Sequence, residues 1–432
     1  MIHFEQVLPQ AKEVLGRHQI AKALAGVFVL RDLRGRVRLF LKEQDGKRSD
    51  LEAALPRLAQ ELEAELAPFW GGVIEIDRDD GDFGPILGPV RAEAVPVEPV
   101  SDYPGWQIVE RHVAKSAWTS RIHQPPWPLN PKTPPIVAWY SHKGGVGRST
   151  ALWAAAINFA RAGKRVAVVD LDLESPGVGS LLANSEVEHG VTDYLLERLL
   201  AGESYSPDLE EFITRQTDSA VIGDGGEPIV CIPAGRVGSW YLEKLARLDY
   251  ELLAVHEPGA RNPLPDLLGH LKRHVAPSYV FVDCRAGLHD LGGLAVQQLS
   301  HANILFGLDS RQSWDGLRCI IRRLGHVVTT APSCLVIQAM EDATPGPRRD
   351  EARERFLNNA YIVFCDEFYD EDQVPDIASK GEAHDPLPIP YDPRLAGHQN
   401  LAHAVELFLQ PPYAELSKRV EQLGKRTMIN GE

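Results

Sequence analysis

The stretch WYSHKGGVGRSTALWAAA, from Trp139 to Ala156, constrains the fold more than any other part of the chain. An apolar run leads into it, three glycines follow within four positions, and an alanine-rich helical pattern comes next. Glycines let the backbone curl so that successive N–H groups point at one anion, and a following helix adds the positive end of its dipole. The pattern therefore predicts a strand, an anion-binding loop and a helix.

The loop departs at two positions from the common phosphate-binding pattern G-x-x-x-x-G-K-[ST]. His142 replaces the first glycine and Arg148 replaces the lysine, while Lys143 lies five residues before Arg148. Arginine keeps the charge of lysine in a larger planar group, so the change affects geometry more than charge. A plain glycine turn is the alternative interpretation. The hydroxyl pair Ser149 and Thr150 and the strand–helix context argue against it.

Short apolar runs rich in β-branched residues alternate with helical patterns after residue 135. Such runs fit strands that are buried on both faces of a parallel sheet. Their alternation with helices predicts an α/β domain over residues 136–432 with a doubly wound, mostly parallel sheet. The runs are PIVAWY, RVAVVD, PIVCIP, YVFVDC, NILFGL, CLVIQAM and YIVFC.

Residues 1–120 have a different pattern, and we expect them to form a small α+β module of unknown role. The alternation of apolar and polar residues over 26–43, on both sides of a turn signal, predicts a β-hairpin. Three further elements are expected by periodicity: a helix over 49–70, a short strand over 71–77 and a second helix over 106–118. The proline-rich stretch 121–135 predicts a semi-rigid linker between the two domains.

The loop KGGVGRST resembles the deviant KGGxGK[ST] loop of the ParA/MinD-type P-loop ATPases, in the subset whose loop ends in arginine. Two later motifs resemble that family in the same order. They are VVDLDLESPG, around the second strand, and VFVDCRAGLHDLGG, a Walker B strand with its switch segment. The resemblance covers roughly residues 136–410. It implies a slowly hydrolysing ATPase with ATP and Mg²⁺ as cofactors, which dimerises when ATP binds and acts as a switch on a protein partner.

The resemblance also implies a role for each matching residue. Lys143 would contact phosphates bound by the opposing subunit, and together with Arg148 it would support catalysis. Asp172 would orient or activate the attacking water. The expected Mg²⁺ site comprises Ser149, Asp170 and Asp283. The expected nucleotide site comprises Lys143, Gly144, Gly145, Val146, Gly147, Arg148, Ser149 and Thr150, with Gln338 and Pro390 near the base.

Several alternatives stay open. Asp172 is also explained as a helix-capping acid after a strand, and Arg285 can either reach a phosphate or pair with Asp290. A chain that binds nucleotide without turning it over is the second functional hypothesis. A P-loop kinase is the least favoured, because its relatives carry a tyrosine-rich tail and the C-terminal stretch here has a single tyrosine, Tyr413.

Composition narrows the partners and the location. A net charge of −15 disfavours a global attraction to nucleic acid, so DNA binding is not favoured. The five cysteines form no C-x-x-C pair and the N-terminus lacks a signal-peptide pattern, so we expect reduced thiols and a cytoplasmic protein. No apolar run is long enough for a transmembrane segment. A thin apolar stripe after residue 412 predicts a helix that docks on the domain.

Overall fold

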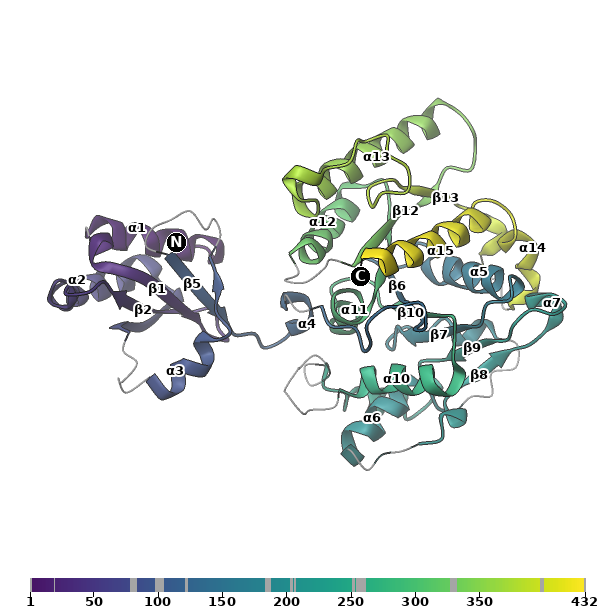
Figure 1. Cartoon of the computed structure of the whole chain (residues 1–432), viewed down its shortest axis with the longest axis horizontal. Coiled ribbons are helices and arrows are strands. Elements are labelled where there is room, and N and C mark those ends of the chain that lie inside the picture. The colour runs from purple at the N-terminus through teal and green to yellow at the C-terminus, as the bar shows by residue number, and fades with distance from the viewer. Residues whose placement is uncertain are drawn as a thin grey trace. The chain divides into compact units, whose positions relative to one another are not determined.

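The computed structural model describes residues 2–18, 20–77, 84–97, 105–120, 123–182, 188–202, 205, 207–250, 253, 262–326, 332–396 and 400–430. The chain forms two compact units, Met1–Ala114 and Lys115–Glu432 (Figure 1). The boundary between Ala114 and Lys115 comes before the expected linker 121–135, so the proline-rich stretch belongs to the second unit.

The first unit is a five-stranded sheet with helices on both faces. Helices α1 and α2 cover one face, where Leu51, Leu58 and Leu62 are fully buried, and Val90 of α3 packs on the other. The strand order is β3-β2-β1-β5-β4. The elements are α1 (Val7–Arg17), β1 (Leu24–Arg31), β2 (Val37–Glu43), α2 (Arg48–Leu66), β3 (Trp70–Ile76), α3 (Gly84–Arg91), β4 (Val95–Pro96) and β5 (Gly105–Glu110). The expected hairpin, first helix and short strand are confirmed.

The expected helix over 106–118 is wrong. Its first part is strand β5, which pairs in parallel with β1, and only Ser116–Thr119 form a helical turn, α4. Trp106 and Ile108 alternate along β5 and face the same core as α1 and α2. Along β5 the buried residues therefore alternate with a period of two. The same apolar residues also fit a helical spacing, but they form a strand.

The second unit is built on an eight-stranded sheet with the order β13-β12-β11-β6-β10-β7-β9-β8. All neighbouring strands run parallel except β8 and β9, which confirms the expected mostly parallel sheet. The strands are β6 (Ile136–Ser141), β7 (Val166–Leu171), β8 (Thr214–Gln216), β9 (Ile229–Ile232), β10 (Tyr279–Cys284), β11 (Ala302–Gly307), β12 (Ser333–Glu341) and β13 (Leu387–Pro390). Every residue of β6, β7, β10 and β11 is buried.

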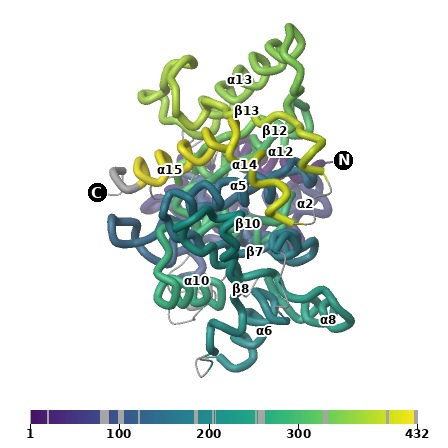
Figure 2. Tube along the Cα trace, turned by 90° about the vertical axis from the view of Figure 1, so that its right-hand side faces the viewer, coloured from purple at the N-terminus to yellow at the C-terminus, as the bar shows by residue number. Residues whose placement is uncertain are grey.

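Helices cover both faces of this sheet, as a doubly wound fold requires (Figures 1 and 2). One face carries α5 (Arg148–Arg161), α7 (Ser219–Ile222), α14 (Val405–Phe408) and α15 (Tyr413–Asn430). The other carries α4, α6 (Val191–Ala201), α8 (Tyr241–Leu245), α10 (Pro263–Val275), α11 (Asp290–Gly293), α12 (Arg311–Gly325) and α13 (Pro347–Glu367). A π-helix (Leu294–Leu299) follows α11.

Two expectations for the helices have opposite outcomes. The run YIVFC, expected as a strand, lies inside α13, where Phe356, Ala360 and Val363 are buried at helical spacing. The expected docked tail is confirmed, because α15 packs against α5 through Leu416 and Val420. Among the described residues, no helix is long and apolar enough to cross a membrane.

The proline-rich stretch packs against the second unit through His301. The Ile136 N–H donates to Nδ1 of His301 at 2.9 Å, and Nε2 of the same ring lies 2.9 Å from the Trp127 carbonyl oxygen. Burial lowers the pKa of His301 to about 4, so the imidazole is neutral near pH 7 and bonds through both nitrogens. This anchoring explains why 121–135 does not behave as a free linker.

Candidate functional site

The glycine loop joins the end of β6 to the start of α5, where the carboxyl ends of the central parallel strands meet. Gly145 and Gly147 have φ angles of +73° and +81°, a left-handed conformation that favours glycine. Helix α5 begins at Arg148, directly after Gly147. The helix N-terminus and the curled loop therefore point backbone N–H groups at one place, as the sequence predicts.

A cavity of about 620 Å³ lies against this loop. Its lining includes the loop from Gly144 to Thr150, Asp172 after β7 and Arg285 after β10. On another side it is lined by Met340 of β12 and by the stretch from Ile389 to Asp392. This volume is within the range of small-molecule sites in proteins.

Arg148 does not point into open space but lies among acids at the floor of the cavity. Its Nε donates to Oδ1 of Asp283 at 2.6 Å, and its Nη2 donates to Oδ2 of Asp172 at 3.0 Å. Its Nη1 donates to the Ser141 hydroxyl at 3.2 Å. Only 8% of the Arg148 side chain is exposed, so the guanidinium is held by partners on β6, β10 and the loop after β7.

Asp283, at the end of β10, connects Arg148 with the next residue of the loop. Its second oxygen accepts a hydrogen bond from the Ser149 hydroxyl at 2.6 Å. Burial raises the pKa of Asp283, and the adjacent Arg148 acts in the opposite direction. Burial also opposes the charge of Arg148, but the charge of Asp283, its hydrogen bond and the charge of Asp172 together outweigh burial, so the pKa of Arg148 is raised. Arg148 and Asp283 therefore form a buried ion pair.

Arg285 pairs with acids of the loop after β7 and not with Asp290, which settles one alternative. Its Nη1 lies 3.2 Å from Oδ1 of Asp172 and its Nη2 lies 2.9 Å from Glu174. Asp290 pairs instead with Lys115. Asp172 is thus held by Arg148 on one oxygen and by Arg285 on the other.

Comparison with known proteins now adds to this geometry. Residues 133–200 match the ParA family model, described as the NUBPL iron-transfer P-loop NTPase. The matched stretch contains β6, the glycine loop, α5 and β7, so this part of the second unit is similar to the ParA family. A search of curated proteins finds no match.

Solved structures that are similar to this chain include a ParA, a MinD and a cobyrinic acid a,c-diamide synthase. The structure of pNOB8 ParA bound to nonspecific DNA is 16% identical, covers 68% of this chain and 99% of its own, and has a TM-score of 0.44. MinD from Pyrococcus horikoshii OT3 with Mg-ADP is 18% identical, covers 68% of this chain and 98% of its own, and has a TM-score of 0.43. Cobyrinic acid a,c-diamide synthase from Mycobacterium smegmatis, with an ATP analog and magnesium, is 17% identical. It covers 68% of this chain and 96% of its own, with a TM-score of 0.42. We rest no proposal on similarities at this level.

Most residues expected at the site do come together. The loop residues Gly144, Gly145, Val146, Gly147, Arg148, Ser149 and Thr150 line the cavity, together with Asp172 and Pro390. Asp283 reaches the site through Arg148 and Ser149. Lys143 starts the loop, and within the described part of the chain its ammonium makes no hydrogen bond or ion pair.

Two expected site residues lie elsewhere. Asp170 is fully buried, and its two oxygens accept hydrogen bonds from the backbone N–H groups of Asp172 and Val178. Burial raises the pKa of Asp170 well above its ordinary value. Its carboxylate therefore shapes the loop after β7.

Gln338 is the second of these residues. It is 2% exposed inside β12 and does not line the cavity, whereas Met340 does. Met340 has a φ of +54°, and the register between β12 and β13 shifts between Ala339 and Glu341. This irregularity turns the strand end toward the site, and no pattern in the sequence indicated it. The sequence patterns also did not identify Tyr391, which lines the cavity, or Glu174 and His289, which pair with each other beside it.

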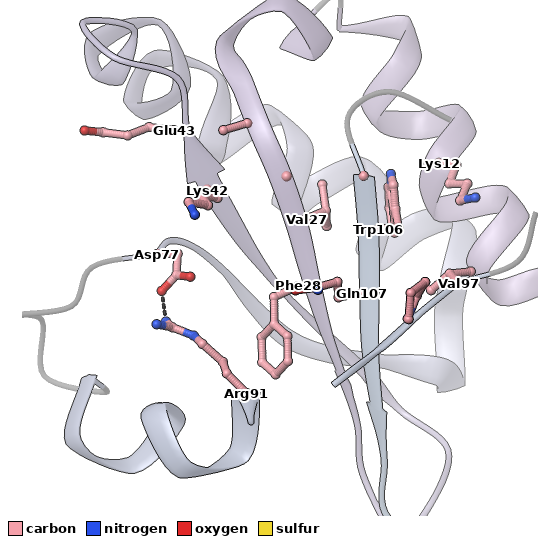
Figure 3. A pocket seen from close by; sticks show the side chains of 14 residues that line it. Lys12, Val27, Phe28, Lys42, Glu43, Asp77, Arg91, Val97, Trp106 and Gln107 are labelled. Carbon is pink, nitrogen blue, oxygen red and sulfur yellow. Dashed lines mark ion pairs between the residues drawn. The ribbon is translucent and has the colours of Figure 1, made fainter. Parts of the chain in front are cut away.

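A second cavity, of about 560 Å³, lies within the first unit (Figure 3). An ion pair between Arg91 and Asp77 lies beside the Phe28 ring, and Lys12 lies 5.7 Å from the centre of the Trp106 ring. Lys42 and Glu43 add one charge of each sign to the lining. Because cationic and acidic side chains are mixed in this lining, it favours no single class of ligand.

Proposed function

We propose that the chain binds ATP with Mg²⁺ at the loop and hydrolyses it slowly, acting as a dimerising molecular switch on a protein partner. The observation that carries this proposal is the joining of Arg148 and Ser149, at the start of α5, to Asp172 and Asp283 beside a cavity of about 620 Å³. A phosphate-binding loop without turnover has little physical need for a second acid that faces the cavity.

The phosphates would bind the curled backbone from Gly144 to Gly147 and the hydroxyl of Thr150. Pro390 and its neighbours on the other side of the cavity would take the base. Ser149 and Asp283 offer a hydroxyl and a carboxylate 2.6 Å apart, which are the oxygen donors that Mg²⁺ prefers. When bound with the nucleotide, Mg²⁺ would offset the charge of the phosphates.

The described residues include no group of three His, Cys, Asp or Glu side chains that could hold a metal by themselves. This fits an ion that arrives with the nucleotide and takes part of its shell from phosphate and water. We leave Asp170 out of this site because both of its oxygens already accept backbone N–H groups.

Asp172 would orient the attacking water, since of Asp170, Asp172 and Asp283 only Asp172 lines the cavity. Both of its oxygens are bonded to arginines, so one arginine has to give way before water can take its place. Arg148 has to leave Asp283, Asp172 or both to reach a phosphate. These exchanges are a physical reason for slow turnover.

The same contacts favour one competing function, which is nucleotide binding without hydrolysis. If Arg148 and Arg285 keep Asp172 occupied after ATP binds, no base is free to act on water. The experiment that separates the two functions uses the purified full chain with ATP and Mg²⁺. We expect binding of a fluorescent ATP analogue together with phosphate release above the buffer background. Binding without release would select the competing function, and absence of binding would overturn both.

ATP-dependent dimerisation is tested at Lys143. Among the described residues its ammonium makes no hydrogen bond or ion pair, as expected of a cation reserved for a second subunit. We expect Lys143→Ala to lower the dimer fraction that ATP induces, measured by light scattering, by about fivefold or more, the size of a typical coupling between sites. Lys132→Ala is the control, because this exposed lysine carries the same charge outside the loop. Unchanged dimers in Lys143→Ala would overturn the role in trans.

We further propose a cytoplasmic location and a partner that is a protein. All five cysteines are free thiols, which suits a reducing compartment. The acidic net charge does not support DNA as the partner, so DNA is left out of this proposal.

A further inference from the structure

The residues from Arg285 to Gly293, called the switch segment below, follow Asp283 and are bonded to the start of the loop. The Gly287 N–H donates to the carbonyl oxygen of Ser141 at 3.1 Å. The Tyr140 hydroxyl donates to the Gly287 carbonyl oxygen at 2.9 Å. Both partners belong to the end of β6, directly before the glycine loop. A displacement of the loop therefore acts on the switch segment through its backbone.

A second set of contacts ties the switch segment to the acid loop after β7. Arg285 bridges Asp172 and Glu174, at 3.2 Å and 2.9 Å. Nε2 of His289 lies 2.9 Å from the same Glu174 carboxylate. Breaking the contact between Arg285 and Asp172 therefore affects the switch segment at Arg285 and, through Glu174, at His289.

The opposite side of the switch segment is bonded to residues 115–119. Lys115 donates to both oxygens of Asp290, from its backbone N–H to Oδ1 and from Nζ to Oδ2, each at 2.9 Å. Nε1 of Trp118 donates to the carbonyl oxygen of His289 at 2.7 Å. Of two neighbouring residues in the switch segment, His289 therefore contacts the acid loop after β7 and Asp290 contacts Lys115.

The fit of Trp118 depends on Gly293 of α11. A Cβ atom at this position would lie 2.8 Å from the indole ring, whereas one at Gly292 would lie 3.6 Å from it, an ordinary contact. Trp118 is 5% exposed, and its ring centre lies 5.6 Å from that of Tyr140. The helix surface is therefore shaped to receive this indole and no larger residue than glycine at position 293.

Residues 115–119 also have a special place in the chain. Lys115 is the first residue of the second unit and directly follows Ala114, the last residue of the first. We propose that residues 115–119 are the binding partner of the switch segment, so that the ligand state of the loop is passed to the chain that enters the N-terminal unit. This inference rests on the proposed function, because it requires that nucleotide binds at the loop.

A static anchor is the competing explanation of the same contacts, and it predicts no response to nucleotide. Two measurements on the full chain separate the two explanations. The first is hydrogen–deuterium exchange of peptides that cover 111–120, with and without ATP and Mg²⁺. The backbone N–H of Lys115 bonds directly to Asp290, so its exchange reports on the contact. We expect ATP to change exchange in these peptides as well as in the loop.

The second measurement is the affinity for a fluorescent ATP analogue in Lys115→Ala, with Lys132→Ala as the matched control. The Lys115 side chain is 47% exposed, so its removal should leave the fold intact. Coupling between two sites is reciprocal, and the contact belongs to the arrangement in which Arg285 occupies Asp172, so weakening it should favour binding. We expect an affinity about fivefold higher in Lys115→Ala, and no change in the control, in line with typical coupling between sites.

The possible results distinguish failure of this inference from failure of the proposed function. Binding in the wild type, with unchanged exchange at 111–120 and equal affinities in the two lysine variants, would overturn this inference and leave the proposed function standing. Absence of binding in the wild type and in Lys132→Ala would overturn both. Faster exchange of 285–293 in nucleotide-free Lys115→Ala, together with the affinity change, would support the inference.

Discussion

Replacing Asp172 with alanine is expected to reduce phosphate release to the buffer background, a loss of about 100-fold or more if this carboxylate assists the attacking water. Asp172, next to the glycine loop, lines the cavity, while Asp170 is buried and bonded to backbone. Affinity for a fluorescent ATP analogue should change by less than about threefold, because phosphate binding rests on the loop and its helix N-terminus. Malachite-green detection of phosphate and a binding titration measure the two quantities.

Glu174→Gln is the matched control for Asp172→Ala. Glu174 lies in the same loop and also pairs with Arg285, but it does not line the cavity. If the loss in Asp172→Ala came only from releasing Arg285, the control would lose release to a similar extent. We expect the control to keep most of its phosphate release. Equal losses in both variants would contradict a direct role of Asp172.

The parts of the fold that the sequence made predictable are those with a strong periodic signal. The strand–loop–helix around Gly145 and Gly147 follows from conformations that other residues adopt poorly. Strands buried on both faces, such as β7 and β10, read as continuous apolar runs. Their carboxyl ends meet in a parallel sheet, so Asp172 and Asp283 were predictable neighbours of the loop.

The errors come from places where tertiary contacts decide between two local patterns. Residues 106–110 satisfy a helical spacing, but pairing with β1 makes them a strand. YIVFC has the composition of a strand, yet the chain around it is a long helix packed on α12. Asp170 looks like a ligand next to Asp172, and only the structure shows that its oxygens are used by the backbone. Apolar composition alone does not distinguish these cases.

The direction of the Arg148 side chain was also beyond the sequence, because a guanidinium can bind phosphate or carboxylate equally well. In the structure it binds two carboxylates and a hydroxyl, and this geometry makes it a structural residue when no nucleotide is bound. Removing it would leave Asp283, whose side chain is 1% exposed, without its cation. Arg148→Ala should therefore lower the free energy of unfolding of the second unit by about 3–5 kcal/mol, as expected when one partner of a buried pair is removed.

Urea unfolding followed by tryptophan fluorescence measures this loss. Six of the eight tryptophans lie after residue 114, so the signal reports mainly on the second unit. Arg285→Ala is the matched control, since it removes the same side chain from the same Asp172 at a site that is 27% exposed. We expect it to cost at most about 1 kcal/mol, because pairs near the surface contribute little. Equal losses in the two variants would show that burial of Arg148 has no special effect.

The double variant Arg148→Ala with Asp283→Asn identifies the cause of the loss. If the cost of Arg148→Ala is the buried charge left on Asp283, neutralising that charge should recover part of it, and the two changes will not add. Simple additivity would instead place the cost in lost packing of the arginine. The same interaction bears on function, because a phosphate that attracts Arg148 has to compete with Asp283. A strong coupling between the two residues would therefore predict both a stable nucleotide-free state and slow turnover.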